Sequence, residues 1–179
     1  MGEKGSIYSK GKGDLRLIER LLAELPGFRG YKEKELRRES DKLLRNHLYR
    51  KLRGARNDLK EVFQRLSDYR RYELFTDMDR LIARLDRVAE KINHASYGYA
   101  GFFNLVKVEE EELNKMIDFD SQLIEYANNI LDVTAKFKAA IMETKFGEAE
   151  NYIAKVGSAL EALEKRFGER AEVILGVKG

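Results

Sequence analysis

Apolar residues recur three and four positions apart over most of the chain, which is the spacing of one face of an α-helix. Four long series of this kind occur, at residues 48–69, 78–95, 113–141 and 146–174. A shorter series begins after Asp14, a residue type that caps helix N-termini, and stops at Pro26 and Gly27. No segment shows the period of two that a half-buried strand requires. The pattern predicts an all-α protein, an elongated antiparallel helical bundle of about five helices.

The second helix is expected to be unusually long. It opens near Tyr31, and its apolar register passes through Gly54 unchanged to about Phe75. A single helix of about 45 residues would reach about 65 Å at 1.5 Å per residue, which favours an elongated molecule. Thr76 and Asp79 fit a short form of the capping box, so the next helix is expected to begin there.

The chain is expected to form one domain. Residues 1–13 contain four glycines and three lysines, and we expect a flexible tail there, followed by a single helical-bundle domain over 14–179. In the series at 113–141, flanking apolar residues make the seam wider than that of a two-stranded coiled coil. Residues 145–168 resemble one edge of a tetratricopeptide helix pair, but no second copy occurs at the expected period, so we expect no repeat architecture.

Composition narrows the classes of function. The 179 residues include no Cys, which rules out disulfides, cysteine nucleophiles and cysteine-ligated metals. His47 and His94 both lack the carboxylate three positions earlier that a di-iron bundle needs, so we expect no metal site and no cofactor. No Ser–His–carboxylate arrangement can be assembled, and no apolar run reaches the roughly 20 residues of a membrane span. We therefore expect a cytoplasmic protein that is not an enzyme.

Charge is distributed unevenly along the chain. Residues 1–75 carry a net charge of +8, residues 76–108 carry +1, and residues 109–179 carry −6. The basic and acidic parts can pair within the fold, which is the simpler interpretation, or can face separate partners. Abundant Lys, Arg and Glu with only two Gln is typical of proteins from hot environments, so we predict a melting midpoint well above about 50 °C.

The long helix presents a basic face. At 100° per residue, its cations fall within a wedge of about 80° beside the apolar seam, with tyrosine among them. Such a face can bind an acidic protein surface or follow a phosphate backbone, or can pair with the acidic C-terminal helices. Contact with a membrane surface is not expected. The partner-binding candidates are Arg38, Lys42, Arg45, Tyr49, Arg53, Arg56 and Lys60.

The segment at residues 96–103 is the most unusual in composition, with four aromatic residues and two glycines. It can be a hydrophobic connection folded over the end of the bundle, or an exposed aromatic docking patch for a partner. The candidate residues of this aromatic loop are Tyr97, Tyr99, Phe102 and Phe103.

Asp120 occupies a seam position between Met116 and Leu123. An unpaired carboxylate there would cost several kcal/mol of desolvation, on the order of the penalties measured for buried charges. We therefore expect Asp120 to form a buried or half-buried pair with an Arg or Lys from residues 1–75, which would fix the helix register. The functional alternative is a carboxylate that binds a metal ion or a substrate.

These patterns predict a non-catalytic helical interaction or scaffold protein that presents its basic, tyrosine-bearing helix face and aromatic loop to a protein partner. Self-association is also expected, because long apolar seams favour it. Two alternatives remain open. One is a nucleic-acid-binding protein that uses the basic face of residues 31–75, and the other is an enzyme or regulator whose site forms on folding or dimerisation.

Overall fold

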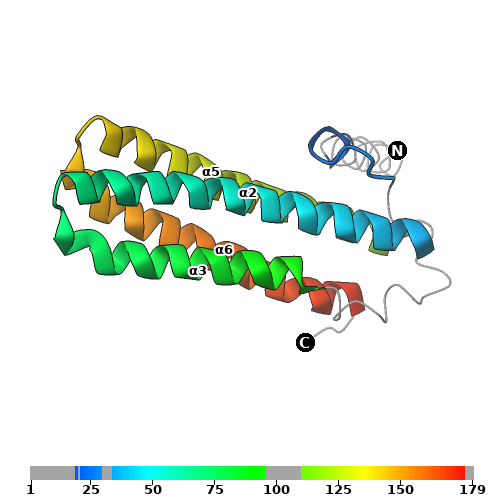
Figure 1. Cartoon of the computed structure of the whole chain (residues 1–179). Coiled ribbons are helices and arrows are strands. Elements are labelled where there is room, and N and C mark those ends of the chain that lie inside the picture. The colour runs from blue at the N-terminus through cyan, green and yellow to red at the C-terminus, as the bar shows by residue number, and fades with distance from the viewer. Residues whose placement is uncertain (1–18, 20, 30–33, 96–109, 176–179) are drawn as a thin grey trace, which may run out of the picture. The chain divides into compact units, whose positions relative to one another are not determined.

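The computed structural model describes residues 19, 21–29, 34–95 and 110–175. These residues form α-helices, 3₁₀ turns and loops and contain no strand, so the prediction of an all-α fold is confirmed (Figure 1). The predicted tail at 1–13 and the aromatic loop at 96–103 lie outside the described residues. The four long helices are α2 (Lys34–Asp68), α3 (Phe75–Asn93), α5 (Glu110–Met142) and α6 (Ala149–Leu175).

The helix α2 has 35 residues and ends at Asp68, so the prediction of one helix of about 45 residues that continues to Phe75 is wrong. The amide of Arg70 donates to the carbonyl of Ser67 at 2.9 Å, and the next amide donates to the carbonyl of Leu66 at 2.9 Å. This pair of hydrogen bonds is the Schellman motif, which closes helix C-termini. Arg70 has φ 56°, where Gly or Asn is the usual residue, so the sequence contains no conventional stop signal.

The entry into α3 also differs from expectation. A 3₁₀ turn at Tyr72–Leu74 continues directly into the helix, whose N-cap is Leu74, and this residue makes no side-chain cap hydrogen bond. The capping role expected for Thr76 and Asp79 is therefore wrong, although the helix begins only one residue before Thr76.

The contacts of the chain gather in two compact units, and α2, α5 and α6 contribute residues to both. The single helical-bundle domain over 14–179 stays a prediction. Of the described residues, unit 1 comprises 19, 21–29, 34–45, 110–122 and 170–175, and unit 2 comprises 46–95 and 123–169.

In unit 1, the described part of the first segment ends where the sequence indicated. Gly27 adopts φ 91°, a left-handed conformation that Gly tolerates, and it follows Pro26 directly. Leu21, Leu25 and Phe28 are buried on either side of this stop. Apolar side chains of α2 and α5 complete the described core of this unit: Leu44, Met116, Ile117 and Phe119.

Unit 2 consists of two antiparallel helical hairpins. In the first, α2 and α3 approach each other at Tyr49 and Glu90 and again at Arg56 and Asp86. In the second, α5 and α6 are held by stacked aromatic rings, whose centroids lie 5.3 Å apart, from Phe137 and Tyr152. Figure 1 shows the two turns at the same end of this unit, where the rings of Tyr69 and Phe146 make contact.

The two hairpins lie side by side in the same orientation. Between α2 and α5, Lys138 forms ion pairs with Asp58 and Glu61 at 3.2 and 2.8 Å. Between α3 and α6, Glu164 forms ion pairs with Arg84 and Lys91. Each helix of one hairpin therefore has a parallel neighbour in the other, which is how hairpins stack in helical repeat proteins.

The buried positions of the two hairpins correspond to each other at a spacing of 75 residues. Leu52 and Ala127 are one such pair, and Leu85 and Leu160 are another. This repetition was not predicted, because the resemblance of residues 145–168 to a tetratricopeptide helix pair indicated a shorter period. On α2 and α5 the paired positions are 48/123, 52/127, 55/130, 59/134, 62/137 and 66/141, and every one of these side chains is fully buried.

Candidate functional site

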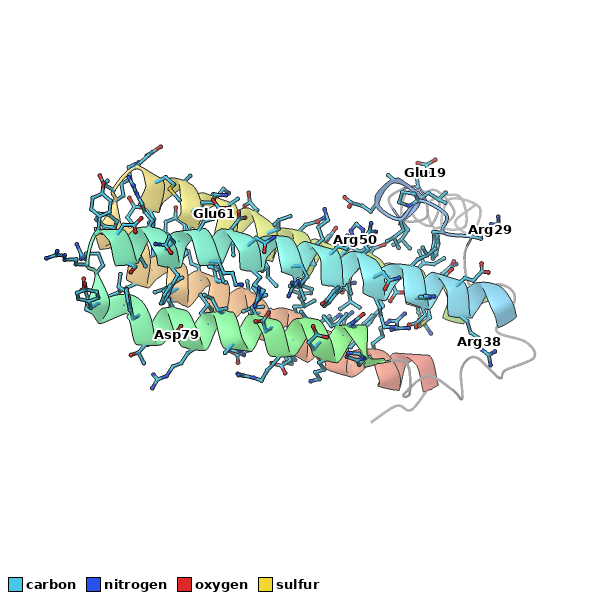
Figure 2. All side chains as sticks on the ribbon, in the orientation of Figure 1. Glu19, Arg29, Arg38, Arg50, Glu61 and Asp79 are labelled. Atoms are coloured by element: carbon cyan, nitrogen blue, oxygen red, sulfur yellow. The ribbon has the colours of Figure 1, made fainter. Side chains whose placement is uncertain are left out.

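Four cations of the expected basic face are exposed on α2. Arg38 and Lys42 belong to unit 1, and Arg53 and Lys60 belong to unit 2. None of the four forms an ion pair with a carboxylate of residues 38–95 or 113–170. In Figure 2, the side chain of Arg38 extends away from the ribbon of α2. These four side chains keep their charge available at the surface.

The other three members of the face are engaged within the fold. Arg45 is buried, and its Nε donates to a carboxylate oxygen of Asp41 at 2.8 Å on the same helix. The Tyr49 hydroxyl donates to Glu90 Oε1 at 3.0 Å, and this hydrogen bond is the main reason why the pKa of Tyr49 is raised. Arg56 lies 2.5 Å from a carboxylate oxygen of Asp86.

The acids that contact Tyr49 and Arg56 were not those expected. The simpler interpretation of the charge distribution had the basic face pair with acids of residues 109–179. Tyr49 and Arg56 instead contact Glu90 and Asp86 of α3, which come from the near-neutral middle of the sequence. The short turn after α2 explains this, because it places α3 beside α2 in the same hairpin.

Asp120 is fully buried in unit 1 and has a precise partner. Its two carboxylate oxygens accept hydrogen bonds from Nε and Nη2 of Arg170 at 2.8 and 3.2 Å. The third nitrogen, Nη1, donates to Oδ1 of Asp41 at 2.5 Å, and the other oxygen of Asp41 accepts from Arg45. Asp41, Arg45, Asp120 and Arg170 thus form one cluster, which we call the ionic cluster.

The arginine that binds both carboxylate oxygens of Asp120 comes from a different part of the chain than expected. We expected an Arg or Lys from residues 1–75, and the residue that binds both oxygens is Arg170 of α6. Asp41 and Arg45 of the basic part complete the arrangement. The relative exposures of Arg170, Asp120 and Asp41 are 1%, 0% and 2%, so two carboxylates and two guanidinium groups balance each other almost without water.

The ionic cluster has the chemistry of a structural contact. Each of its four carboxylate oxygens already accepts a charge-assisted hydrogen bond from an arginine, so the negative charge is compensated within the fold. Among the residues that the structure describes, no three His, Asp or Glu side chains form a group that could hold a metal ion. His47 is largely buried, whereas His94 is exposed and lies 3.3 Å from Glu90.

A surface that the sequence analysis missed lies at the turns of unit 2. Tyr69 was placed in the apolar seam but is 45% exposed, and Tyr72 is 61% exposed. Arg65 lies 4.6 Å from the ring centroid of Tyr69, and Arg71 lies 5.4 Å from that of Phe146. We call the group of these side chains the turn-end surface: Arg65, Tyr69, Arg70, Arg71, Tyr72, Met142 and Phe146.

The sequence does contain a signal for the turn-end surface. Tyr69, Tyr72 and Phe75 follow one another at intervals of three, and Tyr69 would lie on the seam only if the helix continued past it. The helix ends before them, so their rings gather at the turn, where those of Tyr72 and Phe75 meet edge to face at 5.3 Å. The expected aromatic loop residues Tyr97, Tyr99, Phe102 and Phe103 cannot be compared with it, because they lie outside the described residues.

Comparison with protein-family models, with curated protein sequences and with solved structures finds no match to this chain. No described helix has the length and apolar character of a membrane span.

Proposed function

We propose that this chain is a non-catalytic helical interaction protein that binds an acidic surface of a protein partner through the basic face of α2. The observation that supports this most directly is the spare positive charge on that helix. Arg38, Lys42, Arg53 and Lys60 are exposed and have no carboxylate partner among the described side chains. Arg53 and Lys60 are seven residues apart, two helical turns, so both point to the same side of α2.

The surroundings of the face favour a protein partner over nucleic acid. Asp86 and Glu90 of α3 lie beside it, in contact with Arg56 and Tyr49. A phosphate backbone would be repelled by these carboxylates, whereas a protein surface of mixed charge can accommodate them. The hydroxyl of Tyr49 is already bonded to Glu90, so the tyrosine is not free to turn toward a base.

The turn-end surface supports the same proposal independently. Tyrosine and arginine are the residue types that dominate binding energy at protein interfaces, and here their positions are fixed by ring contacts within unit 2. Groups that are held in place before binding lose little side-chain entropy when a partner docks. We place a second contact of the partner at this surface.

Charge reversal tests the basic face. The chain would be immobilised and used to capture proteins from its source cells, with Arg53→Glu/Lys60→Glu for unit 2 and Arg38→Glu/Lys42→Glu for unit 1. The proposal expects one stoichiometric protein partner that is released by moderate salt and lost with at least one reversed pair. Lys155→Glu/Lys165→Glu is the matched control, because it makes the same charge change on the exposed side of α6.

A second measurement separates the nucleic-acid alternative. Electrophoretic shift with RNA and DNA would be measured at several salt concentrations. Binding that weakens with a steep logarithmic dependence on salt, and that disappears in the same reversed variants, would replace the protein partner by a polyanion. Equal capture of the protein partner by all variants would exclude the basic face from binding.

Two finer features belong to the same proposal. The apolar seams favour an elongated antiparallel bundle, and small-angle X-ray scattering of the whole chain tests it through the maximum dimension. We also propose a cytoplasmic location, which a charged composition without cysteine favours, and fractionation of the source cells tests it.

A further inference from the structure

The ionic cluster of unit 1 replaces the apolar seams of three helices with charge. On α2, Asp41 and Arg45 flank the buried Leu44. On α5, Asp120 follows Met116 by one helical turn, and on α6 Arg170 follows the buried Phe167 by three residues. Each charged residue therefore occupies a position at which the helical period predicts an apolar side chain.

Unit 2 is built differently. Its seam positions on α2, from Leu48 to Leu66, are all apolar and fully buried, and on α5 the single polar member is Thr134. The Thr134 hydroxyl donates to the carbonyl of Leu131 on its own helix, so its hydrogen bond is satisfied without a partner on another helix. Loss of one side chain in such a core leaves a cavity, whereas loss of one side chain in the ionic cluster leaves buried charge.

Within the ionic cluster, Arg170 is the residue on which the others depend. It donates to both oxygens of Asp120 and to one oxygen of Asp41, so it links α6 to α5 and to α2. Without it, the two buried carboxylates would lose three charge-assisted hydrogen bonds, one to Asp41 and two to Asp120. Buried carboxylates without these hydrogen bonds are stable only when water hydrates them. Water can reach them only if the helices of unit 1 separate.

We propose that the hydrogen bonds of Arg170 hold the helices of unit 1 together, so that Arg170 acts as a latch. We further propose that unit 1 opens in a separate cooperative step while unit 2 stays folded. Opening would uncover the apolar side chains that unit 1 buries, among them Leu21, Leu25 and Phe28. Local opening of this kind occurs where stability is lowest. Arg170 donates three of the four hydrogen bonds described within the ionic cluster, so its loss weakens the contacts of all three helices at once. This opening depends on the ionic cluster alone and does not require the proposed protein partner.

Amide hydrogen exchange of the full chain, followed by mass spectrometry, tests the latch. Arg170→Leu is expected to lower protection at residues 38–45 and 113–122 by on the order of 100-fold, while residues 48–66 and 127–141 change by less than about threefold. Arg166→Leu is the matched control, since it makes the same substitution one turn earlier on α6, where the arginine pairs with Glu169 of the same helix. This control should leave residues 38–45 and 113–122 protected.

A second variant distinguishes charge from packing. Asp120→Leu/Arg170→Leu removes one anion together with one cation and leaves the Asp41–Arg45 pair in place, so it should restore most of the protection that Arg170→Leu alone removes. Loss of protection in both units with Arg170→Leu would overturn the proposal, and so would unchanged exchange. Failure of the double variant to recover would show that packing rather than charge closes unit 1.

Discussion

Arg70 and Thr144 occupy the same position in two equivalent turns, with φ 56° and 63°. Each follows the end of a long helix, and in each turn the next amide reaches back five residues, from Arg71 to the carbonyl of Leu66 and from Lys145 to that of Ala140. A 3₁₀ turn and a new helix follow in both cases. The hairpins of unit 2 therefore share their closing geometry as well as their buried positions, although neither turn contains the glycine that this geometry favours.

Glycine at these two positions should stabilise the protein. A left-handed conformation costs an L-residue about 1–2 kcal/mol, part of which glycine gives back through its larger entropy in the unfolded chain. Arg70→Gly and Thr144→Gly are each expected to raise the free energy of unfolding by about 0.5–1 kcal/mol, measured by urea denaturation. Arg70→Ala keeps the unfavourable φ and should show no gain. A loss of stability in both glycine variants would mean that the arginine and threonine side chains stabilise the turns.

Gly157 offers a complementary test in the interior of α6. Beyond the neighbouring backbone of its own helix, a Cβ atom there would meet no atom within 4 Å, so Gly157→Ala adds helix propensity without a clash. We expect a gain of about 0.5–1 kcal/mol in the free energy of unfolding. Gly54→Ala is the matched comparison, because a Cβ there would lie 3.2 Å from Cδ1 of Leu131 and the gain should be reduced or reversed. Equal gains at both positions would show that α5 has room to move away from α2.

The helical seams could be predicted from the sequence because burial of one face forces a period near 3.6 whatever the neighbours are. Leu52, Leu59 and Leu85 are all buried where the period placed them. The end of α2 was not predicted because it depends on the hydrogen bonds of the turn at Arg70. No glycine or asparagine in this turn indicates from the sequence that the helix ends there. The repetition at 75 residues was visible in the seams but was sought at a different period.

The candidate site could be predicted less well, because it depends on which helices become neighbours. Asp120 is buried, as its seam position indicated, but its partner Arg170 is 50 residues away in the sequence and lies in the acidic part. Arg45 and Arg56 share a wheel sector with Arg53, yet only Arg53 is left without an acid among the described side chains. A helical wheel shows which residues share a side and gives no information on the acids that a neighbouring helix brings to them.

Tyr49 predicts a pH dependence at the alkaline end. Its hydrogen bond to Glu90 raises the pKa of the hydroxyl in the folded chain above its ordinary value near 10. A group whose pKa is raised on folding contributes stability that is fully present below the unfolded pKa and is lost as the pH rises through the folded pKa. The free-energy difference between the native chain and Tyr49→Phe should therefore be constant from neutral pH to about pH 9 and shrink above pH 10. A difference that grows in alkali would show the opposite shift.

Lys138 and Arg170 each pair with two carboxylates, but the two contacts differ in burial. Substitutions at them should therefore change the free energy of unfolding by different amounts. Lys138 binds two carboxylates, Asp58 and Glu61, and their hydrogen bonds raise its pKa, but the group is open to water. Lys138→Met should therefore change the free energy of unfolding little and show its effect only at low salt. Asp120→Leu should cost about 3–5 kcal/mol at any salt concentration, because it removes the carboxylate that accepts two hydrogen bonds from the buried guanidinium of Arg170. Urea denaturation at low and high ionic strength measures both, and a gain in stability from Asp120→Leu would show that the buried charge is retained for a reason other than stability.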